Sequence, residues 1–267
     1  MDYKILCSDL DGTLLTYKDN VSDFTISEIN RIKEHLRIIL VSARMPQSMT
    51  YIQKNLGIEN EPIICYNGAL VLHGAEELFS TYINMEQITS IYDMADKVGI
   101  ELGLYSNREW YVQTDSERVQ KEIKYTKTLP LYRNTGETIA DWTKRKMGAH
   151  KIMLMGNKEN TDSLLPLLQN KFSETLNLYR SNDTLIEIAP KTVSKLTAIK
   201  LLLQEHESLN EVIAFGDNYN DMEMLQNVGL GIAVGNAREE VKQIAKAITL
   251  ENTKDGVAQF LKNHILI

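Results

Sequence analysis

The chain has little of the chemistry that marks several common classes of protein. Among its 267 residues it has 2 cysteines, Cys7 and Cys65, and both lie in apolar stretches. Neither belongs to a CxxC pair or lies near a ligand-type histidine, so we expect two small buried hydrophobes and no zinc site. The 5 histidines are scattered singly, without an HxxxH spacing, and we expect them to be structural or solvent-facing.

Long apolar runs are also missing. No stretch approaches the ~20 apolar residues that a membrane-spanning helix needs, and two acids directly after the first apolar run argue against an N-terminal signal segment. We therefore expect a cytoplasmic protein with no membrane partner. The net charge of -7 argues against nucleic acid as a partner, because that binding depends on neutralising phosphates. It does not exclude a phosphorylated small molecule, since a metal and one lysine can offset a local deficit of positive charge.

The order of apolar and amphipathic segments predicts two domains. Residues 1–83 and 190–267 alternate short apolar runs with amphipathic stretches, which indicates an α/β core with a parallel sheet. Residues 84–189 contain apolar pairs with helical segments between them, which is typical of an inserted α+β domain with an antiparallel sheet. Within this insert, residues 128–148 show weak periodicity, and we predict an irregular segment there.

The most informative stretch follows the first predicted strand, Ile5-Leu6-Cys7. It continues with Asp9, Asp11, Gly12 and Thr13. Two acids at the end of a buried strand are unfavourable unless a cation or a proton compensates them, and open α/β sheets bind ligands beyond the carboxyl ends of their strands. The alternative is a strand followed by a polar Asp-Gly turn without a chemical role.

Polar groups of other kinds follow other strands or begin a helix. Ser42 follows the second predicted strand, and Lys195 lies in the first turn of the helix after the insert. The segment Gly216–Asp221 follows a predicted strand at 212–215. Because the carboxyl ends of parallel strands meet at one edge, we expect a single site. Its members would be Asp9, Asp11, Asp217 and Asp221 with Ser42, Asn220 and Lys195.

This set of side chains suits phosphoryl transfer. That reaction needs a nucleophile, a proton donor for the leaving oxygen, and positive charge for the phosphate oxygens. A carboxylate that attacks an anionic phosphate is repelled by it, so a divalent ion is required between them, and oxygen ligands favour magnesium. Lysine would supply a further point charge to the phosphate.

The same residues resemble the motifs of the haloacid dehalogenase superfamily. Asp9-Leu-Asp11-Gly-Thr13 is similar to its first motif, Ser42 to its second, Lys195 to its third, and Gly216-Asp217-x-x-Asn220-Asp221 to its fourth. The insert resembles the type C2 cap of the Cof-type subfamily, so the resemblance covers nearly the whole chain. It implies a Rossmann-like core with an inserted α+β cap. Two details depart from the family pattern: Ala43 stands before Arg44 where glycine is common, and Leu196 follows the lysine.

The resemblance also implies a role for each matching residue. Asp9 would form an aspartyl-phosphate, and Asp11 would protonate the leaving oxygen and then activate water. Magnesium would be held by Asp9, the main-chain carbonyl of Asp11 and Asp217, with Asp221 behind the metal, where it orients water or Lys195. Phosphate would be bound by Ser42, Lys195, Asn220 and the main-chain amides of Leu10 and Ala43. Arg44 suits a substrate contact and a salt bridge equally well, and Asn67 and Arg180 are further candidates for substrate contact.

These observations predict a magnesium-dependent phosphatase of small phosphorylated metabolites, such as sugar phosphates, nucleotides or cofactor phosphates. A phosphomutase would use the same aspartyl-phosphate and return the phosphoryl group to a sugar. A non-catalytic regulator that binds a phosphorylated ligand is a second alternative, and the presence of both Asp9 and Asp11 argues against it. The sequence carries no signal for an oligomeric state.

Overall fold

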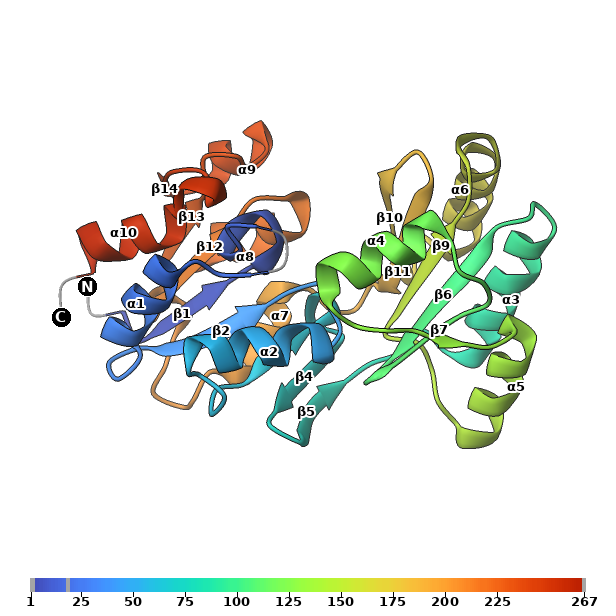
Figure 1. Cartoon of the computed structure of the whole chain (residues 1–267), viewed down its shortest axis with the longest axis horizontal. Helices are drawn as coiled ribbons and strands as arrows, with labels where there is room; N and C mark the ends of the chain where they lie inside the picture. Colours follow the sequence, from blue (N-terminus) through green and yellow to red (C-terminus); the bar gives the residue numbers. More distant parts are fainter. Residues whose placement is uncertain (1–2, 18–19, 266–267) are drawn as a thin grey trace. The chain divides into compact units, whose positions relative to one another are not determined.

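A computed structural model describes residues 3–17 and 20–265. The chain divides into two compact units, Met1–Phe79 with Val193–Ile267, and Ser80–Thr192 (Figure 1). These divisions lie a few residues from the expected positions after 83 and before 190. Ile83 belongs to the second unit because its main chain pairs with that of Ala149 and its side chain is buried in the core of that unit.

In the described part of the chain, the first unit contains an 8-stranded sheet in the order β14-β13-β12-β1-β2-β3-β4-β5. Its strands from β14 to β3 are parallel, and β4 is antiparallel to β3. The central strands bury every residue or nearly every one, as expected when both faces of a parallel sheet are covered. The strands are β1 (Ile5–Ser8), β2 (Arg37–Val41), β3 (Ile63–Cys65), β4 (Leu70–His73), β5 (Glu76–Ser80), β12 (Val212–Gly216), β13 (Leu230–Ala233) and β14 (Ala247–Ile248).

The helices of the first unit form two groups, and in each group one helix contacts the other two. In one group α1 contacts α2 and α10, and in the other α8 contacts α7 and α9. The helices are α1 (Asp23–Ile32), α2 (Gln47–Leu56), α7 (Lys195–Leu202), α8 (Met222–Asn227), α9 (Glu239–Ile244) and α10 (Gly256–His264). The start of α7 is fixed by a reciprocal cap, in which Ser194 Oγ accepts from the Thr197 N–H at 3.2 Å and Thr197 Oγ1 accepts from the Ser194 N–H at 2.8 Å. This cap places Lys195 at the first position of the helix.

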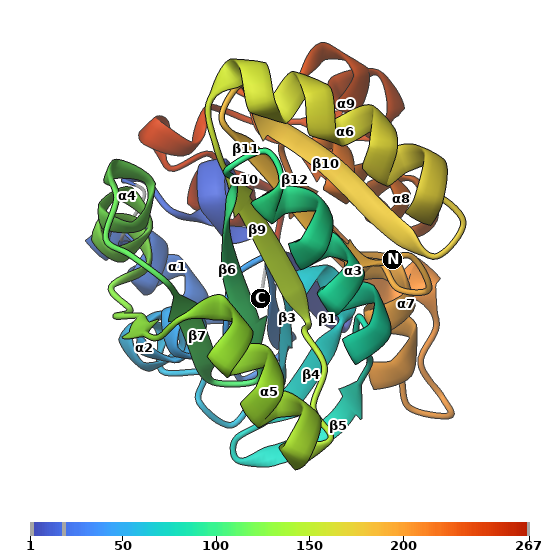
Figure 2. The same cartoon turned by 90° about the vertical axis from the view of Figure 1, so that its right-hand side faces the viewer.

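The second unit has a 6-stranded sheet within the described residues, in the order β10-β11-β9-β6-β7-β8. All its pairs are antiparallel except β7 with β8. Helices α3, α5 and α6 lie over one face of this sheet, and their apolar side chains form a common core with the strands (Figure 2). The elements are α3 (Met85–Asp96), β6 (Glu101–Ser106), β7 (Glu109–Val112), α4 (Glu117–Thr126), β8 (Leu131–Tyr132), α5 (Thr135–Arg145), β9 (Lys151–Met155), α6 (Lys158–Phe172), β10 (Leu176–Asn182) and β11 (Leu185–Pro190).

The prediction of an irregular segment at 128–148 was wrong, because this segment contains β8 and α5. Asn134 caps α5 by accepting from the N–H groups of Gly136 and Glu137 at 2.9 and 3.3 Å. The buried face of the helix is formed by Thr135, Thr138 and Trp142. Only one of these three residues, Trp142, is strongly apolar, so the segment has few apolar residues that could indicate a helix, although it is packed on the core.

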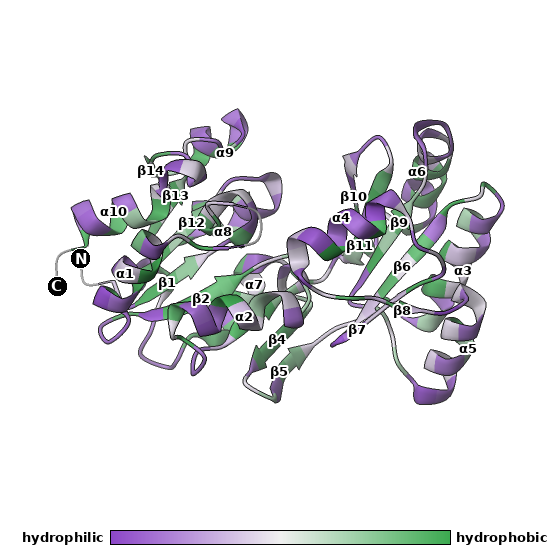
Figure 3. Cartoon of the chain, viewed as in Figure 1, coloured by the Kyte–Doolittle hydropathy of each residue, from purple (hydrophilic) through white to green (hydrophobic). Residues whose placement is uncertain are grey.

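Hydropathy follows the same arrangement in both units. The strands are largely hydrophobic, and hydrophilic residues gather on helices and connecting loops (Figure 3). Among residues 3–17 and 20–265, no helix combines the length and the apolar character that crossing a membrane requires.

Candidate active site

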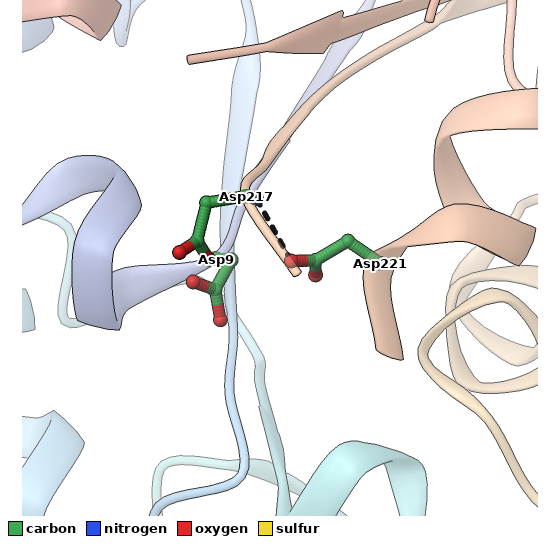
Figure 4. A group of neighbouring side chains, drawn as sticks. All are labelled: Asp9, Asp217 and Asp221. Carbon is green, nitrogen blue, oxygen red and sulfur yellow. Dashed lines mark hydrogen bonds between the residues drawn. The ribbon is translucent and has the colours of Figure 1, made fainter. Parts of the chain in front are cut away.

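The sheet of the first unit brings separated parts of the sequence to one edge. Strand β1 pairs in parallel with both β12 and β2, and Ser8 lies in register with Phe215 and Leu40. The residues that follow these strands therefore lie at the same edge of the sheet. They include Asp9 after β1 and Asp217 after β12, and Figure 4 shows these two side chains close together with Asp221 nearby.

Lys195 lies between two of the acids. Its Nζ donates to Asp9 Oδ1 at 2.6 Å and to Asp221 Oδ1 at 2.6 Å. The side chains of Lys195 and Asp221 are almost completely buried. The second oxygen of Asp221, Oδ2, accepts from the main-chain N–H groups of Asp217 and Asn218 at 3.0 and 3.1 Å, the first of which is dashed in Figure 4. Because protein donors contact both oxygens of Asp221, this residue anchors Lys195 and the loop that carries Asp217.

Three acids and one lysine leave this site with excess negative charge. Carboxylate oxygens of Asp9, Asp217 and Asp221 lie within 4.8 Å of one another. Burial raises the pKa of Asp9 well above its usual range, and Asp221 and Asp217 raise it further, which together outweigh the opposing effect of Lys195. Burial and the neighbouring Asp221 raise the pKa of Asp217 to about 7. A divalent cation would favour the ionised carboxylates, so the donor set fits a metal with oxygen ligands.

The turn after β1 brings Asp217 close to the main chain. Gly12 has φ +82, and a Cβ atom on this residue would lie only 2.5 Å from Asp217 Oδ2. On the other side, Thr13 Oγ1 donates to Asp217 Oδ1 at 3.4 Å. The Gly-Thr pair therefore forms one wall around the Asp217 carboxylate, a contact that the sequence pattern does not reveal.

Asp11 is not a member of the acidic cluster, and its side chain is held by Arg44. The Nε of Arg44 donates to Asp11 Oδ2 at 2.7 Å, and its Nη2 donates to Asp11 Oδ1 at 2.8 Å. The Arg44 side chain is 4% exposed, whereas that of Asp11 is 49% exposed. Arg44 Nη1 also donates to the carbonyl of Ser48 and the hydroxyl of Tyr51, both at 3.3 Å. Of the two roles that the sequence left open for Arg44, the structure shows the salt bridge.

The predicted phosphate-binding groups lie around the same edge. Leu10 and Ala43 lie in the turns that follow the paired strands β1 and β2. Ser42 Oγ accepts from the N–H of Arg44 at 3.2 Å. Asn220 Nδ2 donates to Asn67 Oδ1 at 3.0 Å, so the loop after β3 contacts the loop after β12.

The loop after β3 also comes close to Lys195, because Gly68 in this loop has no side chain to prevent the approach. This residue has φ +104, and a Cβ atom on it would lie 2.4 Å from the carbonyl oxygen of Ser194, directly before Lys195. Arg180, the predicted site residue that belongs to the second unit, lies on β10. Its guanidinium forms ion pairs with Asp162 and Asp183.

Two asparagines near the C-terminus also contact the turn after β1, and the sequence analysis missed both. Asn236 Nδ2 donates to the carbonyl of Gly12 at 2.8 Å, and Asn252 Nδ2 donates to the carbonyl of Leu15 at 2.8 Å. The first contact joins residues that are 224 positions apart. The four motifs extend only as far as Asp221, so nothing in them indicates these partners.

Comparison with known proteins adds an independent observation. A family model described as haloacid dehalogenase-like hydrolase matches residues 6–261. A protein of Haemophilus influenzae is 32% identical over 268 residues, which cover 98% of each chain. The 5-amino-6-(5-phospho-D-ribitylamino)uracil phosphatase YitU of Bacillus subtilis is 27% identical over 274 residues, 97% of each chain. The solved structure of a haloacid dehalogenase-like hydrolase from Bacteroides thetaiotaomicron has a TM-score of 0.89 and 27% identity, covering 98% of this chain and 99% of that one.

Proposed function

The chain belongs to the haloacid dehalogenase-like hydrolase family, as its motifs predicted, and on this premise we propose that it is a magnesium-dependent phosphatase of small phosphorylated metabolites. The observation that carries the proposal is the buried cluster of Asp9, Asp217 and Asp221 around a single lysine, Lys195. The similarity to YitU supports hydrolysis of a phosphate ester and fixes no substrate for this chain.

Asp9 is the proposed nucleophile. Lys195 holds its Oδ1 at 2.6 Å, which leaves Oδ2 to attack phosphorus. A bond then forms between this oxygen and phosphorus while the bond from phosphorus to the leaving oxygen breaks, giving an aspartyl-phosphate. Asp11, protonated on an oxygen that Arg44 has released, donates its proton to the leaving oxygen in this step. It then takes a proton from the water that attacks the phosphorus of the aspartyl-phosphate. The bond between phosphorus and Asp9 Oδ2 breaks as the water oxygen bonds to phosphorus, so that phosphate leaves and both carboxyl groups are restored.

Magnesium fits the excess of negative charge at the cluster. The carboxylates of Asp9 and Asp217 and the main-chain carbonyl of Asp11 would hold it, and when bound it supplies positive charge to the phosphate oxygens. We assign phosphate binding to Lys195, Ser42 and Asn220 and to the main-chain amides of Leu10 and Ala43. Asn67 and Arg180 are proposed contacts for the rest of the substrate.

The test is phosphate release from a panel of sugar phosphates, nucleotides and cofactor phosphates, with magnesium and with a chelator. We expect release that requires magnesium and that falls by about a thousandfold or more in Asp9→Asn, because this change removes the nucleophile with little change in shape. Asp93→Asn, at an exposed position of α3 in the second unit, is the matched control and should retain full activity.

Three results would contradict this proposal. Turnover retained in Asp9→Asn would exclude Asp9 as the nucleophile. Isomerisation of a sugar phosphate without release of phosphate would establish a phosphomutase. Binding of phosphorylated compounds by the folded protein, without turnover of any of them in the presence of magnesium, would establish a regulator.

A further inference from the structure

One turn of the first unit contacts both loops that carry the acids. This segment, residues 234–238, follows β13. The N–H of Val234 donates to the carbonyl of Gly216 at 3.2 Å, and the N–H of Arg238 donates to the carbonyl of Asp217 at 3.0 Å. The main chain of the 234–238 turn is thus attached to the loop that carries Asp217.

The side chain of Asn236 reaches from this turn to the other acidic loop. Its Nδ2 donates to the carbonyl of Gly12 at 2.8 Å, and its Oδ1 accepts from the N–H of Asn252 at 2.8 Å. Asn252 Nδ2 in turn donates to the carbonyl of Leu15 at 2.8 Å. Because a donor and an acceptor contact the two ends of the Asn236 amide, its orientation is determined.

The two acidic loops meet at Gly12. This residue follows Asp11, and it lies so close to the Asp217 carboxylate that a Cβ atom would be 2.5 Å from Asp217 Oδ2. A shift of the Gly12 peptide therefore changes the space between the Asp9 loop and the Asp217 side chain. Asn236 restrains the Gly12 peptide, and Asn236 belongs to the 234–238 turn, which also holds the main chain of Asp217.

We infer that Asn236 is a positioning residue that sets the separation between the loops of Asp9 and Asp217, and through it the affinity of the cation site. The inference rests on the proposed function, since it assumes that these two carboxylates hold magnesium. The Asn236 side chain is exposed, so its truncation leaves no cavity in the core. The strands that lead into both loops are already paired, and the Asp9 N–H donates to the carbonyl of Phe215 at 3.1 Å.

The experiment measures the binding of magnesium alone to the metal-free protein, by calorimetry, together with thermal unfolding and phosphate release. In Asn236→Ala we expect the Kd for magnesium to rise about fivefold, the factor that corresponds to the loss of the one hydrogen bond that holds the Gly12 carbonyl. The magnesium concentration for half-maximal activity should rise with it, while kcat at saturating magnesium stays within about twofold of the parent value. Asn252→Ala, which retains the main-chain donor to Asn236 and loses the link to Leu15, should weaken magnesium binding by a smaller factor.

Asn227→Ala is the matched control. Asn227 Nδ2 donates to the carbonyl of Glu223 at 2.8 Å at the end of α8, so this variant also loses one bond from an asparagine side chain to the main chain. It should bind magnesium as tightly as the parent. An unchanged Kd in Asn236→Ala would overturn the inference, as would weaker binding that the control shares. Failure of the parent protein to bind magnesium or to release phosphate would instead refute the proposed function.

Discussion

Replacing Arg44 with lysine isolates the forked contact that holds Asp11. The guanidinium donates from Nε and Nη2 to the two oxygens of Asp11, at 2.7 and 2.8 Å. Lysine keeps the positive charge and most of the buried volume but offers a point charge instead of a planar fork. The variant therefore changes the orientation of Asp11 and leaves Asp9 and the other carboxylates of the cluster in place.

The size of the effect follows from the geometry. A hydrogen bond to a charged group contributes about 1.5–3 kcal/mol, and half of the Asp11 side chain is exposed, so solvent screening favours the lower end of this range. A loss of about 1.5–2 kcal/mol corresponds to a 10- to 30-fold decrease in kcat/KM if Asp11 must be aligned to protonate the leaving oxygen.

The assay compares two substrates. An alkyl phosphate has a leaving oxygen that needs a proton, whereas p-nitrophenyl phosphate releases a stable phenolate that does not. Since kcat/KM reports the steps up to formation of the aspartyl-phosphate, Arg44→Lys should lower it strongly for the alkyl phosphate and only slightly for the aryl phosphate. An equal loss for both substrates would refute the view that Arg44 acts through the acid function of Asp11.

Two predictions concern stability. Lys195→Met leaves Asp9 and Asp221 buried without their shared cation, so the free energy of unfolding in urea should fall by about 3–5 kcal/mol; a loss below about 1 kcal/mol would show that the pair is readily solvated. Burial lowers the pKa of His150 to about 3 from 6.5, so below pH 6.5 the unfolded chain takes up a proton that the folded chain does not. The parent should lose about 2 kcal/mol between pH 7.5 and 5 through this group, and an equal loss in His150→Gln would contradict that assignment.

Most of the fold was predictable because its signals are local. The short apolar runs before Asp9, Ser42 and Asp217 predicted parallel strands, and each of these residues lies beyond the strand that the pattern indicated. Helix α5 was missed because threonines form two of the three buried positions on its face, so the segment contains few strongly apolar residues. Its one local signal was Asn134, whose side chain caps the first turn.

The sequence predicted that the acids and Lys195 meet at one edge of the sheet, and it predicted much less of the contacts there. Parallel strands bring their carboxyl ends to one edge, and this rule alone placed Asp9 near Asp217. It could not show that Arg44 pairs with Asp11 rather than with another anion, because partner choice depends on side-chain rotamers and on the position of α2. For the same reason the contact of Asn236 with Gly12 had no counterpart in the sequence motifs.

Gly12 shows why the first motif is more restrictive than its local conformation requires. A turn with φ +82 is open to glycine, and asparagine or aspartate adopts related backbone conformations at modest cost. The turn alone would therefore admit several residues. Any residue with a Cβ atom would, however, meet Asp217 Oδ2 at 2.5 Å, and Asp217 is itself held by the main-chain contacts of its loop with Asp221 and Arg238. Neither side can yield without moving a carboxylate of the cluster, so the glycine after Asp11 is dictated by the position of Asp217.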